Sequence, residues 1–231
     1  DIPSILRVRL FEQIDSEVAK VIAANMSKLY SKEEHKNIFG ENAVLMAHKI
    51  EVTYPFHPTY IDTLVTIVDK HEGLEKTRDA IRITRKVVRE LSKQNSNAEL
   101  IMPYHIDVEN REIRGTLLSR DIYRQYATVV DEDIVEKTKQ YEKPELAKVI
   151  AKAVFIRTFV YVGSIKHHQL YPDKKEIIIS SYEPSLAGAL SAEPKDFIDA
   201  LEWVSSNLIY VLSEGGRYWF TQFATPIRML S

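Results

Sequence analysis

Apolar residues recur at intervals of three and four along the N-terminal part of the chain, which is the spacing of amphipathic helices. The first predicted helix is capped by Asp15 or Ser16 and continues to about Tyr30. A second helix follows over residues 41–50, and a third begins at Pro58, because proline fits the first turn of a helix. The N-terminal part is therefore predicted to be a bundle of helices.

The fourth predicted helix, over residues 74–93, has an unusual distribution of charge. Its buried side is assigned to Ile81, Val88 and Leu91. Its arginines follow one another at steps of four, three and four residues, so they share one face; they are Arg78, Arg82, Arg85 and Arg89. From residue 75 to residue 93 there are seven basic and three acidic residues. Two interpretations stay open, a solvated helix surface and a surface that meets an anion.

A polar linker, SKQNSNAE at residues 92–99, separates this bundle from the rest of the chain. The elements predicted after it are a short helix near 109–118, helices over 121–141 and 145–164, a β-rich stretch at Ile177–Ser180, helices over 184–190 and 194–206, and strands over 208–212 and 217–223. Gly215 and Gly216 between the last two strands are typical turn residues of a β-hairpin.

Helix, strand, two helices and a hairpin follow one another in a winged helix, a fold in which a helix-turn-helix precedes a two-stranded wing. The predicted fold class is therefore mainly α, with a helical bundle followed by a winged helix-turn-helix domain that ends in a small C-terminal β-hairpin. The predicted domains are a helical domain over 1–97, connecting helices over 98–143 and a winged-helix domain over 144–231.

Composition limits the chemistry of the chain. Its 231 residues include 31 basic and 33 acidic ones and no cysteine, so a thiolate metal site and a disulfide framework are excluded, and no metal site is predicted. None of the seven glycines fits a phosphate loop, so the chain alone is not expected to be an enzyme of phosphoryl transfer.

No targeting or membrane-spanning segment is evident in the sequence. The longest apolar segment, residues 149–165, contains Lys152 and Arg157 and is therefore predicted to be a buried core helix. No signal-peptide pattern is present, and a cytoplasmic location with no membrane partner is expected. The chain begins without methionine at Asp1 and is apolar at once, which suggests a piece of a longer protein.

Several motifs resemble the C-terminal half of a family of predicted AAA+ superfamily ATPases from archaea and bacteria, whose members carry a domain of unknown function. The motifs are YPFHP at residues 54–58, GLEKTRDAIRITRKVV at 73–88, LIMP at 100–103 and RYWF at 217–220, before TPIRML at 225–230. The resemblance extends from about Arg7 to Met229. It implies an AAA+-type helical lid followed by a winged-helix extension, with the ATPase core elsewhere.

The resemblance also implies a role for Arg78. Members of the family carry an RTRG-like segment where this chain has residues 76–79, with Asp79 in place of the usual glycine. Arg78 matches the sensor 2 arginine, which reaches the terminal phosphates of a nucleotide, so ATP and magnesium are the expected cofactors of the full-length ATPase. A cation in the first turn of a helix is unfavourable by about 0.3 to 1 kcal/mol unless an anion is near. His57, in the YPFHP turn, is either a packed ring or a second hydrogen-bond donor to the nucleotide.

Two other functions remain open from the sequence. The winged helix can contact nucleic acid such as DNA through its basic residues, which are Lys166, Lys174, Lys175 and Arg217. The candidate recognition helix argues against this, because its charged residues are mainly acidic and phosphate contact needs cations. The other alternative is a surface for a partner protein or a homo-oligomer, anchored by Tyr218 and Trp219 unless these rings pack in the core.

Overall fold

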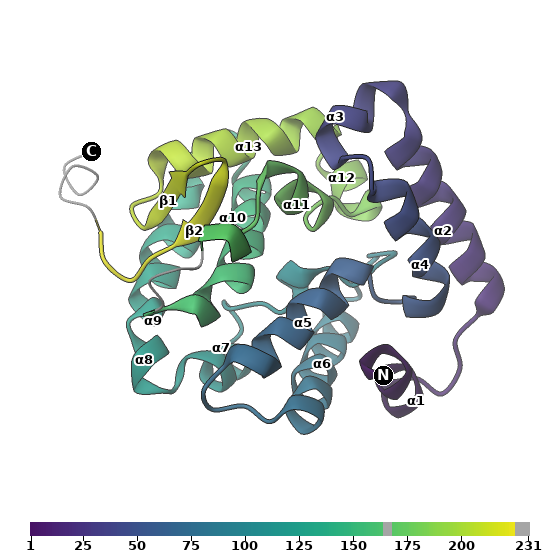
Figure 1. Cartoon of the computed structure of the whole chain (residues 1–231), viewed down its shortest axis with the longest axis horizontal. Helices are drawn as coiled ribbons and strands as arrows, with labels where there is room; N and C mark the ends of the chain where they lie inside the picture. Colours follow the sequence, from purple (N-terminus) through teal and green to yellow (C-terminus); the bar gives the residue numbers. More distant parts are fainter. Residues whose placement is uncertain (164–167, 225–231) are drawn as a thin grey trace.

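The computed structural model describes residues 1–163 and 168–224, and most of them are helical (Figure 1). The α-helices are α1 (Ile2–Leu10), α2 (Ser16–Ser31), α3 (Lys36–Phe39), α4 (Ala43–Thr53), α5 (Pro58–Lys70), α6 (Lys76–Lys93), α7 (Arg111–Leu118), α8 (Asp121–Arg124), α9 (Tyr126–Val129), α10 (Pro144–Thr158), α11 (Lys174–Ile179), α12 (Pro184–Ala189) and α13 (Pro194–Asn207). Two strands, β1 (Val211–Glu214) and β2 (Arg217–Phe220), form an antiparallel hairpin near the C-terminus. The mainly α fold class and the small hairpin are thereby confirmed.

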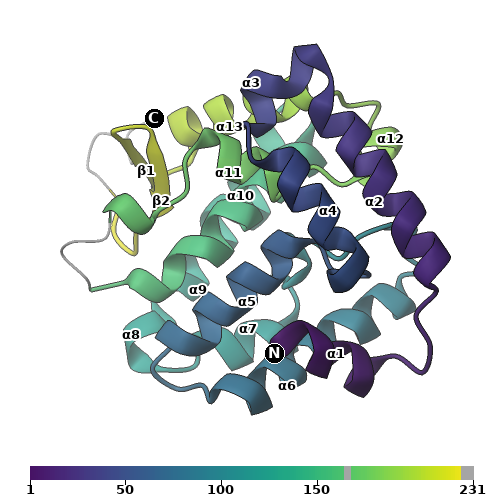
Figure 2. The same cartoon turned by 45° about the vertical axis from the view of Figure 1, so that its right-hand side comes forward.

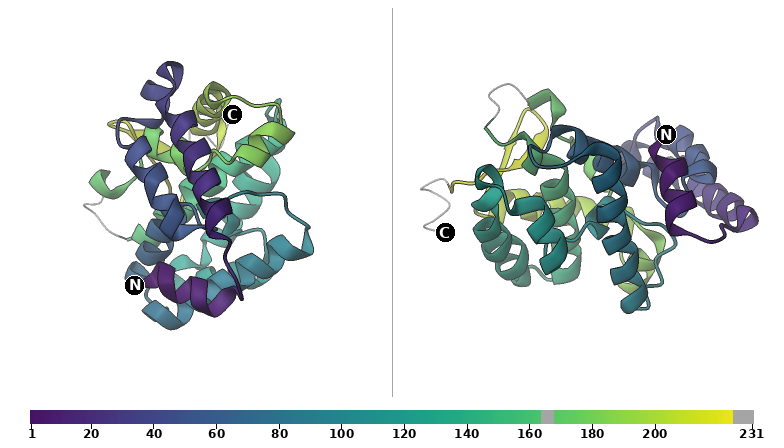
Figure 3. Two further views of the ribbon diagram at one scale, coloured as in Figure 1. Left: turned by 90° about the vertical axis from the view of Figure 1, so that its right-hand side faces the viewer. Right: turned by 90° about the horizontal axis from the view of Figure 1, so that it is seen from below.

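Helices α2 and α4 pack side by side at one edge of the molecule, and the hairpin lies at the opposite end (Figures 1 and 3). The predicted cap of α2 is present, because Asp15 Oδ1 accepts hydrogen bonds from the backbone N–H groups of Glu17 and Val18 at 2.9 and 3.2 Å. These bonds satisfy donors that the first turn of a helix leaves unpaired. Helix α1, which the sequence pattern did not predict, packs against α4, α5 and α6 (Figure 2).

The buried side of α6 differs from the one predicted. Ile81, Val88 and Leu91 are only partly buried, and the helix turns another face to the core. The fully buried residues of that face are Asp79, Ala80, Ile83, Thr84 and Val87. Two polar residues can be buried there because each finds a partner; the hydroxyl of Thr84, for example, lies 2.6 Å from that of Tyr60 on α5.

Three predicted elements take another form in the structure. Ile177–Ser180, predicted as β-rich, instead supplies the end of α11 and its C-cap: the three isoleucines are helical and buried, and Ser180 caps the helix. The long helix predicted over 121–141 is divided into α8, α9, a π-helix (Val130–Glu136) and a 3-10 turn (Lys137–Gln140). The helix predicted to reach residue 164 ends at Thr158, and residue 164 lies outside the described residues.

The C-terminal helices and the hairpin pack on one another. Helix α10 contacts α11, α13 and β2, and α13 also contacts α11 and β1. Gly215 and Gly216 have φ angles of 59° and 76°, the left-handed conformation that a tight hairpin turn requires and that glycine adopts most readily. A short third segment joins the hairpin, since Tyr218 N–H donates to the carbonyl of Pro172 at 3.0 Å, beside an antiparallel bridge between Asp173 and Arg217.

Buried side chains from all three predicted domains belong to one continuous hydrophobic core, which extends from Leu6 to Phe220. The polar linker at residues 92–99 is attached to α12 and the turn before it. Its Glu99 N–H donates to the carboxylate of Glu183 at 3.1 Å, and its Asn97 carbonyl accepts from the hydroxyl of Ser185 at 2.6 Å.

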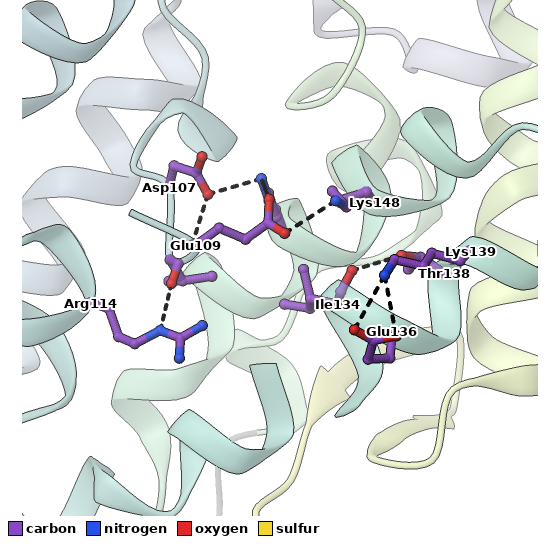
Figure 4. Close-up of polar contacts among 10 residues, drawn as sticks. Asp107, Glu109, Arg114, Ile134, Glu136, Thr138, Lys139 and Lys148 are labelled. Atoms are coloured by element: carbon purple, nitrogen blue, oxygen red, sulfur yellow. Dashed lines mark hydrogen bonds and ion pairs between the residues drawn. The ribbon is translucent and has the colours of Figure 1, made fainter. Parts of the chain in front are cut away.

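A cluster of ion pairs joins the connecting segment to α10 (Figure 4). Lys152 is 9% exposed, and its ammonium lies 2.9 Å from Asp107 and 2.8 Å from Glu109. Lys148, one turn earlier, pairs with the other carboxylate oxygen of Glu109 at 3.1 Å. The charge of Lys152 is thus matched on a helix most of whose residues are buried, as a buried cation requires.

Candidate functional site: the basic face of helix α6

Arg78 is the third residue of α6 and its side chain is 64% exposed. One of its guanidinium nitrogens lies 3.2 Å from the carboxylate of Glu75, and another lies 3.4 Å from that of Asp79. Glu75 is itself exposed and Asp79 is buried. The guanidinium therefore lies at the surface, held by two acidic neighbours of its own helix end.

These two carboxylates supply the anionic environment that a cation in a first helical turn needs. Asp79 also accepts the backbone N–H of Glu75 at 2.6 Å and lies 3.6 Å from Arg82. Burial by itself raises the pKa of Asp79, but the Glu75 N–H and the two arginines outweigh it and leave this pKa below its usual value. Asp79 thus remains an anion and holds Arg78 and Arg82 at one end of the helix.

The four arginines share one exposed face of α6, as predicted, but their partners differ. Arg78 and Arg82 lie beside Asp79, and Arg89 pairs with Glu112 of α7. Arg85 has no ion pair with any residue that the structure describes. The C-terminal half of the face is therefore less neutralised than the first turn.

His57 occupies the packed position, one of the two alternatives that its sequence context left open. It is 0% exposed and precedes α5 as its N-cap. Its Nδ1 accepts the backbone N–H of Thr59 at 3.1 Å, and its Nε2 lies 2.9 Å from the hydroxyl of Tyr30. Since both ring nitrogens are engaged inside the core, His57 does not present a donor to a nucleotide in this structure.

Two motifs that are separated in the sequence lie side by side. The YPFHP turn and the LIMP segment form a parallel bridge between Phe56 and Ile101. The Ile101 N–H donates to the carbonyl of Pro55 at 2.8 Å, and the His57 N–H donates to the carbonyl of Ile101 at 3.0 Å. This bridge joins the turn before α5 to the segment that follows the linker.

Arg217, one of the basic residues predicted to contact nucleic acid, lies near Lys174 and Lys175 of α11, because its backbone forms a bridge with Asp173, but its side chain is engaged within the fold. Arg217 is partly buried and donates to the carbonyl of Tyr171 at 2.8 Å and to Glu176 at 3.3 Å. Lys174 and Lys175 are exposed on α11, and Lys166 lies outside the described residues. The exposed face of α13 and its N-cap is mainly acidic; its charged residues are Glu193, Lys195, Asp199 and Glu202.

The aromatic residues of β2 are mainly part of the core. Trp219 is 8% exposed and stacks on Tyr171 with ring centroids 4.9 Å apart, so its packing in the core is confirmed. Tyr218 is partly buried. Sequence reasoning missed the roles of two further residues near the basic face of α6. Asp79 was missed because charged residues are seldom buried, and Arg9 because its helix, α1, was not predicted.

Within the described residues, no group of three or more acidic or histidine side chains is placed to hold a metal ion. None of the described helices combines the length and apolar character that a membrane-spanning helix needs.

Comparison with protein families gives one finding that covers nearly the whole chain. Residues 1–220 match the model of a family described as the DUF499 second domain. The chain belongs to this family. The family is a domain of unknown function, so membership supplies no reaction and no partner. Comparisons with curated proteins and with solved structures give no match.

Proposed function

We propose that this chain is the nucleotide-sensing lid and winged-helix effector part of an AAA+-like ATPase whose phosphate loop lies in a neighbouring domain. The observation that carries the proposal is the position of Arg78, exposed in the first turn of α6 and held only by carboxylates of the same helix end. The description of the family as a second domain agrees with a neighbouring domain that precedes it.

Arg78 is suited to exchange its partners for a phosphate group. Ion pairs between exposed side chains contribute about 0 to 1 kcal/mol, so the pair with Glu75 is easily broken. A hydrogen bond between a guanidinium and a phosphate contributes about 1.5 to 3 kcal/mol and can be bidentate. The difference between these two free energies is enough to shift the equilibrium between an open and a closed position of the lid about tenfold when a nucleotide is bound beside it.

The arrangement of the C-terminal elements supports the winged-helix part of the proposal. Helix α10, the short segment at Pro172 and Asp173, helices α11, α12 and α13 and the hairpin follow one another, which is the order of a winged helix with one additional short helix. The segment at Pro172 and Asp173 joins β2 through one backbone hydrogen bond and one antiparallel bridge.

Among residues 1–163 and 168–224 no group of side chains fits a magnesium site, so the proposal places magnesium and the phosphate loop in the neighbouring domain. Two acidic residues follow apolar stretches, as magnesium ligands in nucleotide hydrolases do, but both are engaged. Asp69 pairs with Lys76 at 3.0 Å, and Asp131 pairs with Arg114 at 2.9 Å. When bound, magnesium would neutralise the phosphate charge that Arg78 shares.

The experiment is ATP turnover of the full-length protein with Arg78→Ala. We expect turnover to fall at least tenfold, because the substitution removes a contact to the terminal phosphates. Arg124→Ala is the matched control, since Arg124 is also exposed and pairs with an acid three residues away, Asp121, at 2.7 Å. Equal turnover in wild type and Arg78→Ala would exclude Arg78 from the nucleotide site.

A further inference from the structure

A shallow groove lies between α1 and the C-terminal half of α6, away from Arg78. Its volume is about 470 Å³. Arg9 and Leu10 line it from α1; the α6 residues that line it are Arg85, Val88, Arg89, Ser92 and Lys93. The two helices lie beside each other in Figure 2, and they are in contact.

All charged residues that line this groove are cations. Arg89 pairs with Glu112, while Arg9, Arg85 and Lys93 have no ion pair with any residue that the structure describes. The basic surface continues across α6 to Lys86 and then to Arg111 of α7, where Glu90 and Glu112 are the accompanying acids. The positive charge is therefore concentrated in a chain whose overall net charge is −2.

Lys86 lies beside these cations on α6. Its pKa is lowered first by partial burial; the repulsion of Arg82 and Arg89 adds to this effect, and the attraction of Glu112 opposes it. A surface that repels a lysine charge attracts an anion by the same field.

The spacing of the cations suits a phosphate backbone. Arg85, Arg89 and Lys93 follow one another at intervals of four residues, or about 6 Å along the helix axis. This is close to the straight-line separation of neighbouring phosphates along one DNA strand, which combines a rise of about 3.4 Å along the duplex axis with the rotation of the strand about that axis. The hydroxyl of Ser92 is an additional donor of the kind that phosphate oxygens accept.

Two features of the groove lining argue against ligands other than a duplex phosphate backbone. An acidic amphipathic helix would need a continuous apolar floor, and the apolar lining consists of Leu10 and Val88, both only partly buried. A single strand is normally held by stacking of its bases on aromatic rings, and the lining residues, all in the described part of the chain, include no aromatic side chain.

We propose that the groove between α1 and α6 binds the phosphate backbone of double-stranded nucleic acid without reading its sequence. This surface differs from the winged part, where Arg217 is engaged in the fold and the exposed face of α13 is mainly acidic. It is also separate from Arg78, so it does not depend on the proposed nucleotide site.

The test is fluorescence anisotropy of the full-length protein with a labelled duplex DNA, without nucleotide, over a series of salt concentrations. Each phosphate contact contributes about −0.9 to the slope of log K against log salt concentration. We expect Arg85→Gln combined with Lys93→Gln to make this slope less steep by about two. Lys174→Gln combined with Lys175→Gln tests the competing site, because it removes the same charge from the α11 lysines that the sequence suggested as nucleic-acid contacts; binding at the groove predicts an unchanged slope for this variant.

Three results would overturn the proposal. The first is that the wild-type protein does not bind the duplex at 50 mM salt or below. The second is an equal reduction of the salt-dependence slope in the α11 variant. The third is displacement of the duplex by a polyglutamate peptide at equal charge concentration. The last result would assign the groove to an acidic protein segment. All four substituted residues are exposed, so the circular dichroism spectrum and the melting temperature should not change. A difference in DNA binding between the variants is then not caused by a folding defect.

Discussion

The imidazole of His57 donates its Nε2 hydrogen to the hydroxyl oxygen of Tyr30, and the two atoms lie 2.9 Å apart inside the core. The direction of this bond follows from the other ring nitrogen. Nδ1 accepts the backbone N–H of Thr59, so in a neutral ring the hydrogen is on Nε2. The buried, neutral imidazole thus joins α2 to the start of α5 and has no spare nitrogen for a proton.

This arrangement predicts that the protein loses stability in acid. Burial lowers the pKa of His57 from 6.5 to about 3, so below pH 6.5 the unfolded chain binds a proton that the folded chain does not. The contribution of His57 to stability is complete above pH 6.5 and is lost as pH falls toward 3, by on the order of 4 kcal/mol. Burial, followed by the charge of Lys152, also lowers the pKa of His105 to about 3.

Urea unfolding between pH 7 and pH 4 measures the effect. At pH 5, His57→Gln should take up about one proton fewer on unfolding than the wild-type protein. Tyr30→Phe is the comparison, since it removes the acceptor of the Nε2 hydrogen and should lower stability by about 1 to 3 kcal/mol with little change in proton uptake. Proton uptake that is the same in His57→Gln and wild type would show that His57 is not a buried neutral group.

A second prediction concerns Asp133, which lies in the π-helix and is 0% exposed. Its two carboxylate oxygens each accept a backbone N–H at 2.8 Å, one from Ile209 and one from Tyr210, just before β1. Asp133→Ala should lower the free energy of unfolding by about 2 to 5 kcal/mol, because it leaves two buried N–H groups unpaired.

Amide hydrogen exchange at Ile209 and Tyr210 locates this effect. Glu132→Gln is the control, because the glutamine carbonyl can still accept the hydroxyl hydrogen of Tyr210, which Glu132 accepts at 2.6 Å. Faster exchange at both amides in Asp133→Ala, and not in Glu132→Gln, is expected. Unchanged protection of both amides would contradict the assigned role.

The third prediction concerns the ion pairs of Lys152 (Figure 4). Lys152→Ala should destabilise the fold by about 3 to 5 kcal/mol, because it removes a buried cation, leaves the carboxylate of Asp107 unpaired and leaves Glu109 with Lys148 alone. Lys139→Ala is the control; its pair with Glu136 spans 3.2 Å between mainly exposed side chains and contributes about 0.2 to 1 kcal/mol. Thermal unfolding of both variants checks this, and similar losses would show that burial of the Lys152 pairs is unimportant.

Much of the fold follows from local signals in the sequence. Asp15 as a cap, Pro58 in a first helical turn and the glycine pair 215–216 each determine a backbone conformation by themselves, and these elements were predicted correctly. The four arginines of α6 also share one exposed face, because helical spacing alone decides which residues lie on the same side.

Other features depend on contacts that no local pattern contains. Ile177–Ile179 favour a strand by their branched side chains, yet burial of all three against α10 and α13 stabilises a helix. The π-helix interrupts a predicted regular helix. Its Asp133 accepts hydrogen bonds from the backbone N–H groups of Ile209 and Tyr210, which lie 76 and 77 residues later in the sequence. The buried carboxylate of Asp79, and hence the pairing of Arg78, could not be read from helical spacing.

The central claim is that Arg78 meets the outer phosphates of a nucleotide bound by a neighbouring domain. The most direct measurement is a structure of the full-length protein with magnesium and a non-hydrolysable ATP analogue. We expect the guanidinium of Arg78 to lie about 2.7 to 2.9 Å from an oxygen of a terminal phosphate, with its pair to Glu75 broken. An Arg78 that remains paired with Glu75 and Asp79 and faces solvent beside a bound nucleotide would contradict the account.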